Sequence, residues 1–239
     1  MRREKMHTFT YNGRSSDEFD LVISGEDTWK KATPDISRMQ IPGRNGDLIL
    51  SNHRYNNVDI TYHAGIRRNF DQYYTACTNF LLSTPGYCRL EDSYHPDHFR
   101  MALLEKEISP KLDALNHSGS FGLTFSCMPQ LYLKSGEQKQ TFTRAGTITN
   151  PTLFEAKPLL RIYGTGSCGI GDYTITIRSA SSYTDIDCEM EEAFKGSTSC
   201  NDKIELSSNT FPVLKSGANG ITMSGSITKI EVTPRWYIL

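Results

Sequence analysis

The acidic stretch at residues 185–192 is the first place where hydrolytic chemistry could occur. Asp187, Glu189 and Glu191 stand at every second position, and glycosidases use a pair of carboxyl groups. Because alternate side chains of a strand lie on one side, we expect a solvated face or, less often, a calcium or sugar site. A hydrolytic pair needs carboxyls on opposite sides of a cleft. The spacing favours no catalytic residue, and a glycoside hydrolase using these three residues is an alternative.

A second group with possible chemistry lies at residues 92–98. Asp92, His95, Asp97 and His98 offer oxygen and imidazole ligands within seven residues. Zinc sites use recognised spacings or ligands from well-separated elements, and this group matches neither. Turns commonly collect Asp, Pro and His. We therefore predict a polar hairpin tip and no metal site.

Glycines recur between residues 164 and 171, where a phosphate-binding loop would be one interpretation. Such a loop precedes a helix and is followed by Lys-Ser or Lys-Thr, whereas this segment leads into the alternating pattern of residues 173–178. We predict a tight bend within a hairpin. No cofactor is expected.

Size and composition predict a mainly β protein. The chain has 239 residues, which suits two domains, and its 18 glycines, 12 tyrosines and 11 phenylalanines fit many short strands. The formal net charge is −1, so no overall field would hold a nucleic acid or an acidic membrane surface. The six cysteines form no Cys-x-x-Cys pair and are expected to be free thiols in a reducing compartment. With no signal sequence or long apolar segment, we expect a soluble protein made in the cytoplasm, without membrane contact.

The stretch at residues 41–50 is the strongest local signal. Pro42, Gly43, Arg44, Asn45 and Gly46 lie between two apolar runs, and Asn-Gly before alternating apolar residues indicates a hairpin. Arg44 has no acid, base or nucleophile beside it. We predict a structural turn that joins two strands.

The first half contains several predicted strands and one helix. Val58, Ile60 and Tyr62 should point inward from one strand, and residues 120–127 should form another. Apolar residues at three- and four-residue steps predict a helix over residues 70–81. Asn69 and Gln72 are expected to cap its start.

The second half consists of short alternating strands, typical of a sandwich or jelly roll. Residues 135–152 are polar and close on Asn-Pro, so we predict a connector there. The predicted domains are residues 1–134 and 153–239. The apolar end of the chain should be buried in the fold or against a partner.

Taken in order, several segments resemble the distal tail protein family of long non-contractile-tailed phages and their prophages. The most specific is Pro-Gly-Arg-Asn-Gly at residues 42–46. The others, which together with it span nearly the whole chain, are residues 9–13, 86–94 after the helix, 124–129, 158–164, 217–219 and 234–236.

The resemblance implies a structural virion protein of the tail tip or baseplate hub and not an enzyme. It implies an N-terminal β-sandwich with one helix, similar to tail-tube subunits, that assembles as a hexameric ring, and a galectin-like C-terminal β-sandwich. The implied partners are the tail tube protein, the tail-associated fibre or lysin protein and receptor-binding proteins, for host adsorption. DNA would pass through the lumen without specific binding, and assembly would occur in the host cytoplasm.

A carbohydrate-binding module is the other alternative, suggested by the second sandwich and its tyrosines. Such a module, within residues 152–239, would attach a virion or an enzyme to a cell wall. The sequence leaves open the host, the interface residues, the oligomeric state of the free protein, and whether this domain binds sugar or a receptor-binding protein.

Overall fold

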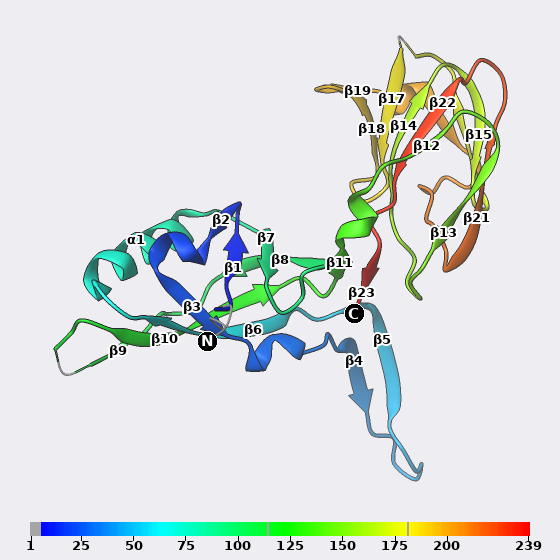
Figure 1. The fold of residues 1–239 in the computed structure, drawn as a ribbon. Coiled ribbons are helices and arrows are strands. Elements are labelled where there is room, and N and C mark those ends of the chain that lie inside the picture. Colours follow the sequence, from blue (N-terminus) through cyan, green and yellow to red (C-terminus); the bar gives the residue numbers. More distant parts are fainter. Residues whose placement is uncertain (1–5, 114, 181) are drawn as a thin grey trace. The chain divides into compact units, whose positions relative to one another are not determined.

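The computed structural model describes residues 6–113, 115–180 and 182–239. The chain folds as two compact units, residues 1–131 with Leu239 and residues 132–238. Strands dominate both units, and the described residues contain one α-helix (Figure 1). The prediction of a mainly β protein with one helix is therefore confirmed.

The first unit is built on one antiparallel sheet with the strand order β2-β1-β7-β8-β10-β6-β3. Its centre is the long pairing of β6 with β10, from Val58 opposite Cys127 to Ile66 opposite Gly119. Hydrogen bonds join these strands in a single sheet, and the N-terminal sandwich stays a prediction. The strands are β1 (Phe9–Tyr11), β2 (Arg14–Ser15), β3 (Leu21–Ser24), β6 (Val58–Ile66), β7 (Cys88–Asp92), β8 (His98–Leu104) and β10 (Gly119–Cys127), with β9 (Lys111–Leu112) beside β10.

The core of the first unit follows the predicted alternation. Val58, Ile60 and Tyr62 are buried, and so are Phe121 and Phe125 of the neighbouring strand. Two 3₁₀ helices, η1 (Ser16–Phe19) and η2 (Glu26–Trp29), flank β3. Pairing of β6 and β10 places the two apolar series on one side of the sheet, where they form one core.

The helix α1 (Phe70–Ser83) buries Phe70, Cys77 and Leu81 against this core. The predicted Asn69–Gln72 capping pair is wrong, because Asn69 adopts a left-handed conformation (φ 49°) and makes no side-chain capping bond. The Phe70 amide instead donates to the carbonyl oxygen of His117 at 3.3 Å. A loop carbonyl thus replaces the side-chain cap for one of the free amides at the helix start.

The second unit contains two antiparallel sheets that share one core. Their orders are β12-β22-β14-β17-β18-β19 and β13-β21-β15-β16-β20, and residues of both sheets, such as Ile162 and Ile221, belong to one buried cluster. The strands are β12 (Gln140–Phe142), β13 (Gly146–Asn150), β14 (Leu159–Tyr163), β15 (Gly166–Ile170), β16 (Tyr173–Ile177), β17 (Tyr183–Asp187), β18 (Glu192–Lys195), β19 (Thr198–Ser199), β20 (Ile204–Leu206), β21 (Gly217–Met223) and β22 (Lys229–Thr233), with the 3₁₀ helix η4 (Asn201–Lys203) before β20.

Residues 135–152, expected as a connector, form parts of the second unit. They contain most of the 3₁₀ helix η3 (Lys134–Glu137) and the strands β12 and β13. Each strand lies at the edge of its sheet, and Ile148 is the fully buried apolar residue of β13. An edge strand with one solvated face needs few apolar side chains, which accounts for the polar composition.

The hairpin predicted at the glycine-rich segment of residues 164–171 is confirmed by the antiparallel pairing of β15 with β16, but the glycines are not all in its bend. Gly166 and Gly169 lie inside the strand β15, and the hairpin turn follows at Gly171. Gly166 has a φ of +135°, and a Cβ there would lie 2.3 Å from the carbonyl oxygen of Ser224. The glycine thus permits close contact with the neighbouring chain segment.

The end of the chain is anchored in the second unit by Trp236, which is 3% exposed. The last strand, β23 (Tyr237–Ile238), pairs with β11 (Leu131–Leu133), and the Leu133 amide donates to the Trp236 carbonyl at 2.9 Å. The aromatic end is therefore covered by the fold at Trp236.

Candidate functional site

Five of the exposed large apolar residues among the described residues lie on one hairpin of the first unit, namely Met39, Ile41, Ile49, Leu50 and Tyr55. Its strands β4 (Pro34–Met39) and β5 (Leu48–Tyr55) form a separate two-stranded sheet (Figure 1). Pairing runs from Met39 opposite Leu48 to Ile36 opposite Ser51, followed by an irregularity before Pro34 and Tyr55.

The turn residues Pro42 to Gly46 lie at the tip of this hairpin. The Arg44 amide donates to the Ile41 carbonyl at 3.1 Å, and Gly43 has a φ of +79°. Proline followed by glycine at the centre of such a bond fits a type II turn. Gly46 also has a positive φ, whereas Asn45 does not, so the tip is longer than a two-residue Asn-Gly turn.

Apolar side chains project from both faces of the hairpin. Met39 lies opposite Leu48, and Leu50 is two residues further along the same strand as Leu48, so Met39 and Leu50 lie on one face of the hairpin. Ile49 lies on the other face. Their exposed fractions are 54%, 48% and 58%. Ile41 and Tyr55 are exposed as well. An isolated hairpin is marginally stable at best, and clustered exposed apolar side chains indicate an interaction site.

Polar contacts hold the base of the hairpin. Arg54 pairs with Asp35 at 2.6 Å across the two strands, and this bond, with help from Asn52, lowers the pKa of Asp35. The Asn56 amide donates to the Thr33 carbonyl at 2.9 Å. The two strands are thus joined at their base while their tip carries the apolar residues.

The acidic stretch at residues 185–192 does not form the expected solvated face. Asp185 and Asp187 are 6% and 5% exposed, and each accepts two hydrogen bonds from an arginine, Arg161 and Arg235 respectively. Burial opposes ionisation of Asp187, but the Arg235 guanidinium and backbone amides outweigh it, so its pKa is lowered.

The other two carboxylates of the candidate hydrolytic set lie outside the strand. Glu189 and Glu191 follow the end of β17 and are exposed. Glu191 has a left-handed backbone and lies 3.9 Å from Lys157. The structure brings neither residue opposite Asp187 across a described cavity.

Residues 92–98 contain a turn that is held by hydrogen bonds to Asp92, as their polar composition predicts. Asp92 accepts hydrogen bonds from the Tyr62 hydroxyl and from the backbone amides of Tyr94 and His95. Burial lowers the pKa of His98, with His95 adding to the effect. The described residues contain no group of three or more His, Cys, Asp or Glu side chains that could hold a metal ion.

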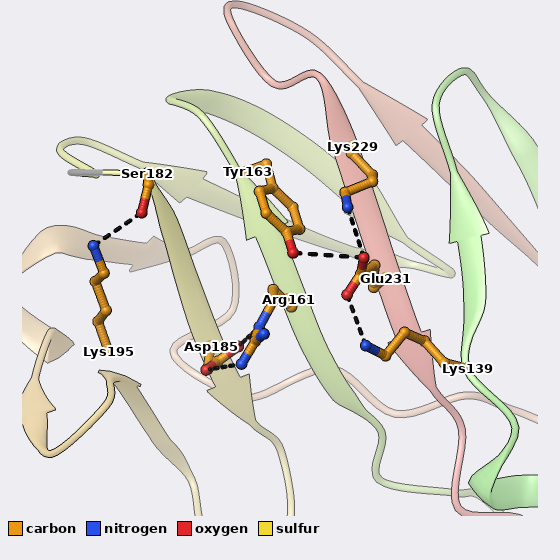
Figure 2. A network of polar contacts seen from close by, with 8 residues as sticks. All are labelled: Lys139, Arg161, Tyr163, Ser182, Asp185, Lys195, Lys229 and Glu231. Carbon is orange, nitrogen blue, oxygen red and sulfur yellow. Dashed lines mark hydrogen bonds and ion pairs between the residues drawn. The ribbon is translucent and has the colours of Figure 1, made fainter.

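A polar network covers the outer face of the six-stranded sheet (Figure 2). Glu231 pairs with Lys139 at 2.9 Å and with Lys229 at 2.7 Å. Strand register places Arg161 between Glu231 and Asp185. Sequence reasoning missed this network, although oppositely charged residues at outward positions of three strands were the available signal.

Cations cover tyrosine rings on the same face. The Lys229 ammonium lies 3.9 Å from the ring centroid of Tyr163, and the Arg161 guanidinium lies 4.3 Å from that of Tyr183. A sugar binds to tyrosine by stacking on the ring, so these covered ring faces are not open to one.

All six cysteines are free, and five are buried. Burial raises the pKa of Cys77, Cys127 and Cys168 to about 12. These thiols act as small apolar core residues. Within the described part of the chain, no helix is long and apolar enough to cross a membrane.

No protein-family model matches the chain, and no curated protein matches it. The fold is similar to that in the crystal structure of SPP1 Dit, described as a paradigm of the hub adsorption apparatus in phages that infect Gram-positive bacteria. The TM-score is 0.76 at 14% identity, over 98% of this chain and 100% of that one. This chain has the fold of a phage distal tail protein.

A second similar structure comes from the phage p2 baseplate in its activated conformation with Sr. The TM-score is 0.50 at 11% identity, and the match covers 95% of this chain and 97% of that one. The resemblance drawn from the ordered segments is thereby confirmed at the level of the fold. Because the SPP1 Dit match covers both chains nearly completely, it includes both units.

Proposed function

We propose that this chain is a structural component of the distal end of a phage tail, acting in host adsorption as a tail-tip or baseplate hub protein. The observation that carries the proposal is the fold shared with SPP1 Dit over 98% of the chain. The two stretches considered as catalytic or metal-binding candidates have structural contacts, since Asp187 pairs with Arg235 and Asp92 accepts bonds from turn amides. The protein therefore acts by shape and docking.

The first unit forms the ring, and the β4–β5 hairpin is its assembly arm. Met39, Ile49 and Leu50 are each about half exposed, so full burial of each side chain gains roughly 1 kcal/mol. In a self-assembling protein, the partner that packs against the exposed side chains of this hairpin is a second copy of the chain. When the arm of one copy packs on the body of the next, the contact is head-to-tail, and such contacts form a ring when the rotation between neighbouring copies closes.

The ring is proposed to be a hexamer that caps the tail tube and docks the tail-associated fibre or lysin protein. The formal net charge of −1 suits a lumen that passes DNA without binding it specifically. The second unit, with two sheets around one core, is proposed to be galectin-like and to contact receptor-binding or other neighbouring virion proteins. The protein is made and assembled in the host cytoplasm and ends in the virion.

Light scattering and electron microscopy of the purified full chain, alone and with its tail tube protein, test this proposal. We expect rings that are lost in the double variant Ile49→Asp, Leu50→Asp. A matched control, Leu82→Asp, changes a leucine of α1 that is 66% exposed and should leave assembly intact. A wild-type chain that stays monomeric at high concentration and is recruited by neither tube nor fibre protein would overturn the proposal.

A further inference from the structure

A cavity of about 300 Å³ opens beside strands β17 and β18 of the second unit. Its lining includes Lys195 and Lys203, the hydroxyl residues Ser179, Thr184 and Thr198, and Tyr183. The described residues that line it include no carboxylate. We propose that this cavity binds a phosphate group, either free or esterified to a small polyol. The proposal is independent of ring assembly.

The charge of this cavity differs from that of the sheet face next to it. On that face, Arg161 is neutralised by Asp185, and Lys139 and Lys229 share Glu231. Lys203, by contrast, has no described carboxylate within ion-pair distance, and its polar contact is the Cys200 sulfur at 4.0 Å. Each cation of the neighbouring face therefore contacts a carboxylate, whereas the positive charge of Lys203 at the cavity has no such described partner.

The second lysine is held at the cavity wall. The Lys195 ammonium donates to the Ser182 hydroxyl at 2.9 Å (Figure 2) and lies 5.1 Å from the ring centroid of Tyr183. Both contacts restrict a side chain that is otherwise flexible. Because the ammonium is positioned before a ligand arrives, less conformational entropy is lost on binding.

Two ammonium groups with nearby hydroxyls fit a phosphate better than a carboxylate. Lysine binds phosphate as a point charge, whereas carboxylates favour the planar guanidinium of arginine, which donates two parallel hydrogen bonds. Two arginines near the cavity are already paired, since Arg161 stacks on Tyr183 and binds Asp185 through two hydrogen bonds, and Arg178 pairs with Glu205. The volume lies at the lower end of small-molecule sites, about 300 to 1,000 Å³, which suits a phosphate or a short phosphate ester.

The test is an NMR titration of the full chain with inorganic phosphate at constant ionic strength, with chloride as the exchanged anion. We expect saturable shifts in the amides around the cavity. Lys203→Gln and Lys195→Gln should each weaken binding about tenfold, the loss expected for one charge-assisted hydrogen bond. The matched control is Lys215→Gln, which removes an exposed lysine paired with Asp172 on the other sheet and should bind as the wild type does.

A parallel titration with glycerol phosphate distinguishes the two sources of the phosphate. Tighter binding of the ester identifies an esterified polyol, and equal binding identifies free phosphate, and both results support the site. Thermal melts establish that each variant is folded. The absence of saturable phosphate binding by the wild type, or unchanged binding in both folded cavity variants, overturns the proposal and leaves the ring assembly untouched.

Discussion

Arg235 binds Asp187 through two parallel hydrogen bonds of 2.7 and 2.8 Å. This pair joins the end of β17 to the segment between β22 and β23, far apart in sequence. Asp187 also accepts bonds from the backbone amides of Glu189 and Met190 at 3.0 and 3.2 Å. One carboxylate of the acidic stretch therefore fixes both a turn and the end of the chain.

Replacing Asp187 by alanine should destabilise the second unit, because it leaves the Arg235 guanidinium without its partner. The Asp187 side chain is 8% exposed and that of Arg235 is 29% exposed, so we expect about 2 to 3 kcal/mol, below the 3 to 5 typical of a fully buried pair. Urea unfolding measures the change. Asp172→Ala is the control, since its exposed pair with Lys215 should contribute less than about 1 kcal/mol. Equal losses in the two variants would contradict the structural role of the Asp187 pair.

The stability of the second unit should fall in acid because of Glu231. Hydrogen bonds from Lys229 and Lys139 lower its pKa from 4.5 to about 2. Since the folded state holds this carboxylate ionised, its contribution is complete above the unfolded pKa and is lost as pH falls from 4.5 towards 2. Across this pH range, the unfolding free energy of Glu231→Gln should fall less steeply with decreasing pH than that of the wild type. Glu205→Gln, which alters an exposed pair with Arg178, should keep the wild-type slope, and an identical slope in the Glu231 variant would refute the prediction.

Features that depend on residues close together in the sequence could be predicted, whereas features that depend on distant residues could not. The alternation of Val58, Ile60 and Tyr62 predicts a strand face that depends on neighbouring residues alone, and the structure buries all three. Asp187 behaves otherwise, because its partner Arg235 is 48 residues away. The sequence pattern around Asp187 carries no sign of that pairing, so a solvated face was the natural expectation.

The same reasoning explains the other differences. The polar composition of β12 and β13 hides two edge strands, because their partners β22 and β21 supply the hydrogen bonds from more than sixty residues away. The hairpin at residues 34–55 was predictable from its turn residues. Its isolation from the main sheet was not, since strand order is a property of the whole unit.

Alkylation of the native protein should label Cys88 first. Cys88 is partly exposed, whereas the other five cysteines are buried, and burial raises the pKa of Cys77 and Cys127 to about 12. A thiol must be both accessible and ionised to react. Mass spectrometry after a short iodoacetamide pulse, with a sample unfolded in urea as the control, gives the order of labelling. Labelling of Cys127 as fast as Cys88 would contradict the core of the first unit.

The geometry of the hairpin tip should control assembly separately from folding. Gly43 has a φ of +79°, and a Cβ added there would have no atom within 4 Å, so Gly43→Val would act through backbone strain alone. That strain costs about 1 to 2 kcal/mol for an L-residue, and the tip should lose its turn. Gly43→Asn is the matched variant, since asparagine tolerates this conformation better. We expect ring formation to fall in the valine variant and to recover in the asparagine variant, with the melting temperature of the protein nearly unchanged in both. If the valine variant assembles as the wild type does, the tip is not part of the contact, and the interface must lie on the exposed faces of β4 and β5 alone.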